Sequence, residues 1–337
     1  MASLGDITSR KDEHLEVCSR ENVESSRTNF WDEVSLPPHR CLPEINFEEV
    51  QLKANFLGNS YDLPLLISSM TGGSETGDQI NVTLAKAAQK ANIPMGVGSQ
   101  RIQLEQRDRK IFQIRKHAPK ASLFANIGAV QLNYGVSKED CLWLVEQLEA
   151  QALILHLNPL QEAIQQEGDR NFKSLLPKIS NLKKSLSVPL IIKEVGCGID
   201  LHSAKLLIEA GADCIDSAGM GGTHWGYVEG LRNSNRKNLG DLFRNWGTPT
   251  PELLKLYREH LPSEVAIVAS GGIRSGVDMA KAIYLGANMV GMALPFLNAA
   301  QNGEEAVLSL IDFHRETLKT ALFCMGMNSP EALRNHG

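Results

Sequence analysis

The chain has 337 residues, of which 42% are hydrophobic and 22% charged, a composition typical of a globular protein with a large buried core. Its formal net charge of −5 gives no overall basic field of the kind that attracts nucleic acid or an acidic membrane. An anionic substrate would therefore need a local basic site.

Cysteine spacing and hydropathy indicate in which cellular compartment the protein is expected. The six cysteines stand far apart with no C-x-x-C pair, which argues against a zinc site or a disulfide framework and favours reduced thiols. The apolar runs are far shorter than the ~20 residues that span a bilayer, and no secretory apolar region follows the first basic residues. We expect a cytoplasmic protein with no nucleic-acid and no membrane partner.

In chain order, the first feature is a polar segment over residues 1–62. It holds the charged run Arg10–His14 and the pair Pro37–Pro38. From composition alone, this segment is interpreted as a solvated arm that packs loosely on the rest of the protein.

From about residue 63 onward, short runs rich in Val, Ile and Leu alternate with amphipathic stretches, which is typical of repeated βα units. Eight such pairs can be counted. The expected strands are Pro64–Met70, Pro94–Ser99, Leu123–Ile127, Ala152–Leu157, Pro189–Val195, Asp213–Ser217, Val265–Ser270 and Met289–Met292.

Helices are expected between the strands, and some carry start and stop signals. Ser275 with Asp278 three residues on forms a capping-box pattern, and Gly211 and Gly286 stand just past expected helix ends. The clearest helices are Asp78–Ala91, Lys138–Ala150, Asp200–Glu209, Pro251–His260 and Gly276–Leu285. Eight units over this length predict an α/β fold, a TIM (β/α)8 barrel. An open doubly wound sheet is the alternative, but its glycine-rich G-x-G-x-x-G turn is missing after the first strand.

The working residues of such a barrel lie at the carboxyl ends of the strands. Ser270–Gly271–Gly272 ends the seventh strand and can form a phosphate site from backbone N–H groups, with Arg274 adding charge. A tight turn with no ligand is the alternative. Lys193 stands alone on an apolar strand, where it would be costly to bury unpaired. Its side chain points toward an electron-rich ring or a phosphate in one interpretation. In the alternative, it extends to the surface or forms an ion pair, with Glu194 exposed beside it.

The loop after the fourth strand carries further polar candidates. Glu162 next to Gln161 suits Mg²⁺ when a diphosphate supplies the other ligands, although a loop glutamate is more often solvated surface. His156 is either a contact to a diphosphate or a hydrogen-bonded residue of the barrel rim.

Taken together, these segments resemble the successive signature blocks of the type 2 isopentenyl-diphosphate isomerases. The glycine-rich loops alone would indicate only an FMN barrel, whereas the H-L-N-P-L-Q-E run and the basic arm are specific to that family. The blocks are Arg10–His14, Met70–Gly73, Gly98–Arg101, His156–Glu162, Gly221–Thr223 and Ser270–Arg274.

The resemblance implies an isomerase that interconverts isopentenyl and dimethylallyl diphosphate on reduced FMN, with NADPH or another reductant serving only to reduce the flavin. It implies a homo-oligomer, a tetramer or an octamer. It also implies a set of groups that hold FMN at the strand ends. These are Ser69, Met70, Thr71, Ser99, Asn126, Lys193, Thr223, Gly271, Gly272, Ile273, Arg274, Ala293 and Leu294.

The same resemblance implies a diphosphate site with Mg²⁺ at Glu162, and catalytic roles for Gln161, His156 and Asn158. On this reading residues 1–62 are an arm that contributes to the substrate site, and residues 63–337 form the FMN-binding barrel. The implied substrate contacts are Arg10, Lys11, Ser99, Gln100, Arg101, His156, Asn158 and Gln161.

Two departures from the family pattern stand out. Met220 is bulkier than the small residues that often precede Gly-Gly-Thr, so we expect altered contacts near the flavin. The stretch Trp225–Arg244 is long for a βα connection and is expected to act as a lid, with Glu229 near the flavin.

A double-bond shift needs one carbon protonated and another deprotonated, and an ordinary carboxyl is too weak an acid for that at neutral pH. A reduced flavin can exchange the proton and stabilise a cationic intermediate. Rival readings are a hydroxy-acid oxidase, which would need a His base that the seventh strand end lacks, and an IMP dehydrogenase-like enzyme. The second would need a loop cysteine, and none follows Thr223 before Cys324. A non-catalytic flavin- or diphosphate-binding sensor is the third alternative.

Overall fold

Eight short parallel strands pair in chain order and close into a barrel in the computed structural model, which describes residues 4–27, 29–106 and 113–336. Seven of these strands lie within a predicted one and β5 extends one residue beyond its predicted end at Ile127, so the predicted TIM (β/α)8 barrel is confirmed. The strands are β3 (Leu65–Ile67), β4 (Met95–Gly96), β5 (Leu123–Gly128), β6 (Ala152–His156), β7 (Leu190–Lys193), β8 (Cys214–Asp216), β9 (Ala266–Ser270) and β10 (Met289–Met292).

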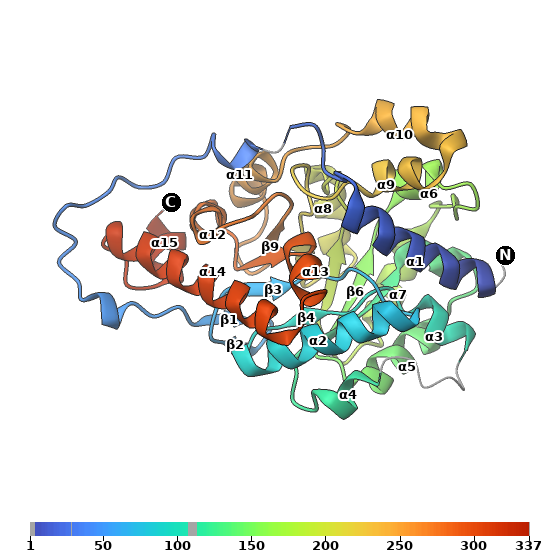
Figure 1. Cartoon of the computed structure of the whole chain (residues 1–337), viewed down its shortest axis with the longest axis horizontal. Helices are drawn as coiled ribbons and strands as arrows, with labels where there is room; N and C mark the ends of the chain where they lie inside the picture. The colour runs from blue at the N-terminus through green and yellow to red at the C-terminus, as the bar shows by residue number, and fades with distance from the viewer. Residues whose placement is uncertain (1–3, 28, 107–112, 337) are drawn as a thin grey trace.

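Helices surround the barrel between the strands (Figure 1). The predicted capping box is present, since Ser275 Oγ accepts from Asp278 N at 3.1 Å and the Asp278 carboxylate accepts from Ser275 N at 3.0 Å. Gly211 and Gly286 end their helices with φ of 102° and 104°, a region that favours glycine. The helices are α2 (Glu75–Ala91), α3 (Arg101–Glu105), α4 (Ile114–His117), α5 (Lys138–Leu148), α6 (Pro159–Ile164), α7 (Leu175–Lys183), α8 (Leu201–Glu209), α9 (Trp225–Arg232), α10 (Lys237–Phe243), α11 (Thr250–His260), α12 (Gly276–Tyr284), α13 (Leu294–Ala300), α14 (Glu304–Cys324) and α15 (Pro330–His336).

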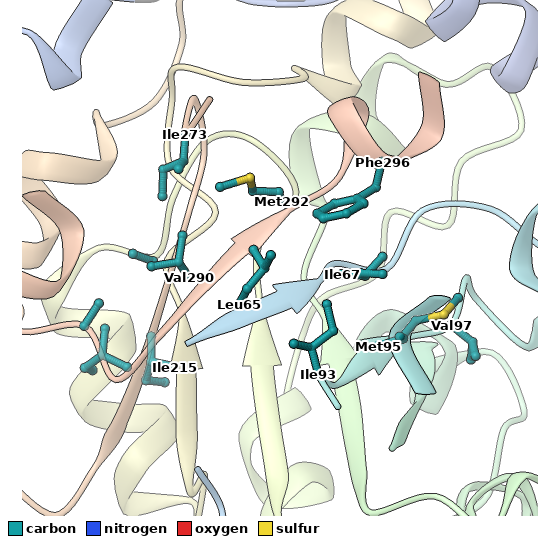
Figure 2. Packing of buried hydrophobic residues seen from close by; sticks show 14 of the residues in the cluster. Leu65, Ile67, Ile93, Met95, Val97, Ile215, Ile273, Val290, Met292 and Phe296 are labelled. Carbon is teal, nitrogen blue, oxygen red and sulfur yellow. The ribbon is translucent and has the colours of Figure 1, made fainter. Parts of the chain in front are cut away.

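Apolar side chains of the strands and of the loops that follow them fill the space between barrel and helices. Figure 2 shows Leu65 and Ile67 of β3 among Met95, Val290 and Phe296, all of which are buried. This packing fixes the positions of the strand ends, where the polar residues follow.

The described residues of the predicted arm, 4–27 and 29–62, do not form the loosely packed, solvated segment that composition suggested. Helix α1 (Leu4–Arg20) lies across the end of the barrel at which the strands point, beside α9 (Figure 1). Leu15, Val23 and Trp31 are buried in the main hydrophobic cluster, so this segment is part of the core. Residues 1–3 and 28 of the predicted arm lie outside the described residues.

Beyond Trp31 the chain runs along the outside of the barrel to its opposite end (Figure 1). There β1 (Ala54–Phe56) and β2 (Asn59–Tyr61) form an antiparallel hairpin. Phe56 and Tyr61 pack against the side chains of Leu66 and Phe124 from the barrel interior. The hairpin therefore closes the amino-terminal end of the barrel with apolar side chains.

The long connection after β8 is helical. It contains α9, a short 3-10 turn at Ser234–Arg236, and α10, and α9 packs against both α1 and α6. None of the helices in the described part of the chain is both long enough and apolar enough to cross a membrane.

Candidate active site

Two adjoining cavities lie at the carboxyl ends of the strands. The first, of about 170 Å³, is bounded by α1 on one side and the barrel on the other. The second, of about 80 Å³, lies over the glycine loops that follow β8 and β9 and over the end of β10. Their shared wall consists of Ser69, Lys193, Val195, Thr223, Trp225, Ala293 and Leu294.

The structure brings nearly all predicted site residues to these two cavities, although their separations in the chain are large. The second cavity holds the predicted residues Ser69, Lys193, Thr223, Gly271, Gly272, Ile273, Arg274, Ala293 and Leu294. The first holds Arg10, Lys11, Ser69, Met70, Thr71, Ser99, Arg101, Asn126, His156, Asn158, Gln161, Glu162, Lys193, Thr223, Ala293 and Leu294.

Gln100 is the predicted substrate contact that lies elsewhere. Its side chain is buried, its Oε1 accepts from Asn126 N at 3.0 Å, and its Nε2 donates to Gln103 Oε1 at 2.8 Å. The prediction is corrected: the amide of Gln100 supports β5 and lines neither cavity. Met220 also lines neither cavity, and its amide donates to Thr248 O at 2.9 Å.

The loop after β9 has the form of an anion site. Gly271 and Gly272 adopt φ of 114° and 75°, and within the described chain their N–H groups donate to no protein acceptor. Ile273 is anchored in the core beside Met292 (Figure 2), so only its backbone can face a ligand. Free amide N–H groups on a rigid loop suit a phosphate.

Two unpartnered hydroxyls and one ion pair complete the second cavity. The Oγ atoms of Ser68 and Ser69 are buried without a hydrogen-bond partner among the described residues. Arg274, the predicted phosphate cation, is already ion-paired with Glu24, and its Nη1 donates to Ile273 O at 2.8 Å. Orphaned donors beside a glycine-lined cradle fit a phosphorylated, hydrogen-bonding cofactor such as FMN.

Lys193 lies in the shared wall and is paired with a residue that the sequence analysis did not identify. Its Nζ is 3.4 Å from Asp216 Oδ2 on the neighbouring strand, and Ser270 Oγ donates to Asp216 Oδ1 at 2.5 Å. Glu194, exposed in the alternative interpretation of Lys193, is buried, and burial raises its pKa to about 7. The ion pair with Asp216 thus offsets the free-energy cost of burying the charge of Lys193.

His156 lies level with Lys193 because the two residues are paired in the register of β6 and β7. Burial, with the charges of Lys193 and Lys11, lowers the pKa of His156 to about 4, so its ring is neutral at pH 7. Asn126 Nδ2 donates to Val97 O at 3.0 Å, which turns Asn126 Oδ1 toward His156 Nδ1 at 2.9 Å. Nδ1 therefore carries the ring proton, and Nε2 is left as an acceptor.

Hydrogen bonds fix the polar residues of the loop after β6. Asn158 Nδ2 donates to Gln161 Oε1 at 3.1 Å and to Glu162 Oε1 at 2.9 Å, while Gln161 Nε2 donates to Glu229 Oε1 at 2.9 Å. Glu229 is expected from the sequence to lie near the flavin; in the structure its carboxylate accepts a hydrogen bond from the Gln161 amide. Gln161 is consequently held at both ends of its amide.

Helix α1 supplies the basic side of the first cavity. Lys11 Nζ donates to Ser99 O at 3.0 Å and to Gly72 O, and burial lowers its pKa to about 7. Arg10 is half-buried, and with the Gln165 amide oxygen turned toward it, Arg10 Nη1 donates to that oxygen at 2.7 Å. Arg101 lies opposite and pairs with Asp169 at 2.6 Å. Three cations therefore surround a cavity in a protein of net negative charge.

A divalent cation at Glu162 would have to take most of its ligands from water and substrate. No group of three or more His, Cys, Asp or Glu side chains able to hold a metal occurs among the described residues. Glu162 is buried, and Asn158 Oδ1 beside it has no partner in the described part of the chain. One carboxylate with a spare amide oxygen fits Mg²⁺, which keeps several waters and binds substrate phosphates.

Comparison with known proteins gives a family for this site. A family model described as "FMN-dependent dehydrogenase" matches residues 15–117 and 105–336. Isopentenyl-diphosphate delta-isomerases of Nostoc sp. and Rickettsia peacockii are each 47% identical to the chain, over 98% and 94% of its length and 95% and 93% of theirs.

Solved structures show the same fold at much lower identity. Flavocytochrome b2 with sulfite bound superposes with a TM-score of 0.72 at 18% identity, covering 100% of this chain and 85% of that one. A lactate oxidase from Pediococcus acidilactici gives 0.70 at 15% identity, with 99% and 93% covered. By sequence, the chain belongs to the isopentenyl-diphosphate delta-isomerase family within the FMN-dependent dehydrogenases.

Proposed function

We propose that the protein interconverts isopentenyl diphosphate and dimethylallyl diphosphate, with the phosphate of reduced FMN in the second cavity, its ring extending past the shared wall to Met70, Thr71, Ser99 and Asn126, and the substrate in the rest of the first cavity. The observation that carries this proposal is the shared wall between a phosphate-binding glycine loop and a cavity ringed by Arg10, Lys11 and Arg101. Such a wall would place a flavin ring beside a diphosphate-bearing substrate.

The chain's own residues would position the substrate and exclude water. Arg10, Lys11 and Arg101 would bind the diphosphate, each contact being a charge-assisted hydrogen bond. Gln161, held by Asn158 and Glu229, would keep the alkene in one orientation. The FMN ring, when bound and reduced, supplies the acid–base chemistry and the electron-rich surface that an alkene proton shift needs.

Lys193 would face the polar edge of the flavin ring, where a cation stabilises the negative charge of the reduced form. Asp216 and Ser270 hold it in place from below. His156 cannot donate to a phosphate oxygen from its neutral Nε2, so its contact to the diphosphate would require protonation or the other tautomer. Arg10, Lys11 and Arg101 would therefore carry most of the diphosphate binding.

The proposal extends to Mg²⁺ at Glu162, to NADPH as the reductant of the flavin, and to a cytoplasmic homo-oligomer. Glu162 and Asn158 support the metal, as argued above. Leu242 and Trp246 are 82% and 62% exposed near α10, which supports contacts between copies. Light scattering of the purified protein tests the tetramer or octamer, and anaerobic bleaching of FMN by NADPH tests the reductant.

The decisive experiment is proton NMR of isopentenyl diphosphate incubated with the FMN-loaded protein in D2O, with and without dithionite. We expect dimethylallyl diphosphate carrying deuterium only when the flavin is reduced. A hydroxy-acid oxidase would instead bleach its flavin on lactate or mandelate under nitrogen. Bleaching without isomerisation would replace our proposal with that activity, and flavin binding without either would favour a sensor.

A further inference from the structure

Residues 22–27 and 29–31, here called the strap, join α1 to the outside of the barrel and lie against the glycine loops of the second cavity. Val23 O accepts from His224 N at 2.9 Å, and Glu24 forms an antiparallel bridge with Thr223. The strap therefore contacts the loop after β8 through its backbone.

Trp31 extends this contact to the loop after β9. Its indole is buried, and Nε1 donates to Gly271 O at 3.0 Å. Its own carbonyl oxygen accepts from Lys281 Nζ of α12 at 2.6 Å. Lys281 thus anchors the backbone of Trp31, and the indole N–H donates to one carbonyl of the glycine loop.

The contact with Gly271 O sets the direction of a neighbouring donor. A trans peptide is planar, so its C=O and the N–H of the next residue point in opposite directions. With Gly271 O turned toward Trp31, the N–H of Gly272 must point away from the indole. Trp31 lines neither cavity, whereas Gly272 lines the second one.

The space on that side is open for a ligand. Gly222 faces Gly272 N, and a Cβ at position 222 would stand 2.9 Å from that nitrogen. A side chain there would cover the N–H. Glycine at 222 leaves the donor accessible.

A Gly-Gly peptide needs this restraint because both residues reach positive and negative φ at little cost. If the Gly271–Gly272 peptide reversed, its carbonyl oxygen rather than its N–H would meet a phosphate. Arg274 offers limited compensation, since Glu24 already neutralises its charge. Recognition of a phosphate therefore depends strongly on the amide donors.

We propose that Trp31 is a positioning residue that holds the Gly271–Gly272 peptide with its N–H toward the cofactor phosphate, and so sets the preference for phosphorylated over unphosphorylated flavin. This inference rests on the proposed binding of FMN in the second cavity. Trp31 itself acts only through the peptide that it orients.

The test is a titration of the flavin-free full-length protein with FMN and, separately, with riboflavin, followed by quenching of flavin fluorescence. Trp31→Phe keeps an aromatic ring and removes the donor. We expect the Kd for FMN to rise about tenfold, as for loss of a hydrogen bond to a charged ligand, with the Kd for riboflavin unchanged.

Trp246→Phe is the matched control, because the Trp246 side chain is 62% exposed and lies outside both cavities. It should change neither Kd. Lys281→Met removes the anchor behind Trp31 while keeping the indole, and should weaken FMN selectively even if Trp31→Phe proves unstable.

The outcomes separate the inference from the function on which it rests. Equal weakening of FMN and riboflavin in Trp31→Phe and Lys281→Met would make Trp31 a general packing residue and overturn the inference. Unchanged binding of both flavins would also overturn it. A wild-type protein that binds neither flavin would instead overturn the proposed function, and the inference with it.

Discussion

His14 Nε2 lies 2.9 Å from Glu229 Oε1, and this contact joins the amino-terminal helix to the helix that follows β8. The same carboxylate accepts from Gln161 at 2.9 Å and pairs with Arg232 at 2.9 Å. Burial alone would raise the pKa of Glu229, but His14, Arg232 and Gln161 together lower it to about 2. Glu229 is therefore ionised and links α1 to the substrate cavity.

Breaking that link should weaken substrate binding. His14→Ala leaves Glu229 paired with Arg232 but releases α1, which carries Arg10 and Lys11. We expect KM for isopentenyl diphosphate to rise about tenfold with a smaller change in kcat, since one charge-assisted hydrogen bond is lost. Steady-state kinetics at saturating FMN measure this. Glu16→Gln, at a 57% exposed side chain on the same helix, is the control, and an unchanged KM in His14→Ala would contradict the prediction.

Arg10 should contribute to binding directly. Arg10→Ala removes the guanidinium of a half-buried residue from the cavity wall, and a contact made alike to substrate and transition state affects KM more than kcat. We expect KM to rise about tenfold or more, the value of one charge-assisted contact. Deletion of residues 1–14 should have a larger effect at full flavin occupancy. A truncated protein with wild-type KM would exclude the arm from the substrate site.

Lys11 should give the reaction a dependence on pH. Its pKa of about 7 means that the free enzyme loses this charge as the pH rises, and a diphosphate binds the charged form. We expect kcat/KM to fall above pH 7 by up to about tenfold per pH unit. Lys11→Met should abolish this break in the profile. Arg10→Ala is the matched comparison: it should lower kcat/KM at every pH and retain the break.

Glu162 should control the response to Mg²⁺. Glu162→Gln removes the one carboxylate expected on the metal, so the Mg²⁺ concentration for half-maximal activity should rise by at least about tenfold. The Kd for FMN should not change, because Glu162 lines only the first cavity. Glu167→Gln, at a 52% exposed side chain in the same loop, serves as the control. An unaltered Mg²⁺ titration would remove the metal from Glu162.

His314 should make the fold sensitive to mild acid. It is buried in α14, neither ring nitrogen has a partner among the described residues, and burial lowers its pKa to about 4. The unfolded chain binds the proton near pH 6.5, so stability is lost as the pH falls from there toward 4, by up to about 1.4 kcal/mol per pH unit. His314→Leu should reduce this slope in urea unfolding of the flavin-free protein. Identical slopes would refute the role of His314.

The strands could be predicted because each is a short run of Val, Ile or Leu between turn residues, and parallel strands in a barrel are buried on both faces. Helix α1 could not, because much of its surface is polar and its cations face a cavity instead of solvent. Among residues 9–20 of this helix, whose burial the structure describes, Leu15 and Cys18 are the buried apolar residues, too few to give a clear helical pattern.

The pairing of side chains on neighbouring strands also could not be predicted from the sequence. The burial of Lys193 could be predicted from its apolar neighbours, but its partner Asp216 follows from the register of β7 and β8. The signal in the sequence for this ion pair was an acidic residue, Asp216, within the otherwise apolar strand Cys214–Asp216. Gln100 was misplaced because it stands between Ser99 and Arg101, and the direction of a side chain in a turn depends on backbone torsions that sequence does not reveal.

The hairpin that closes the amino-terminal end of the barrel affects the timing of the reaction. Since Phe56 and Tyr61 fill that end, we expect flavin, diphosphate and a reductant to arrive from the side on which α1 lies. The two cavities share a wall there, so a bound substrate shields the flavin from an electron donor. We therefore expect that reduction of the flavin and isomerisation would use the same entrance in turn, and that a high concentration of substrate would slow the activation of the oxidised enzyme.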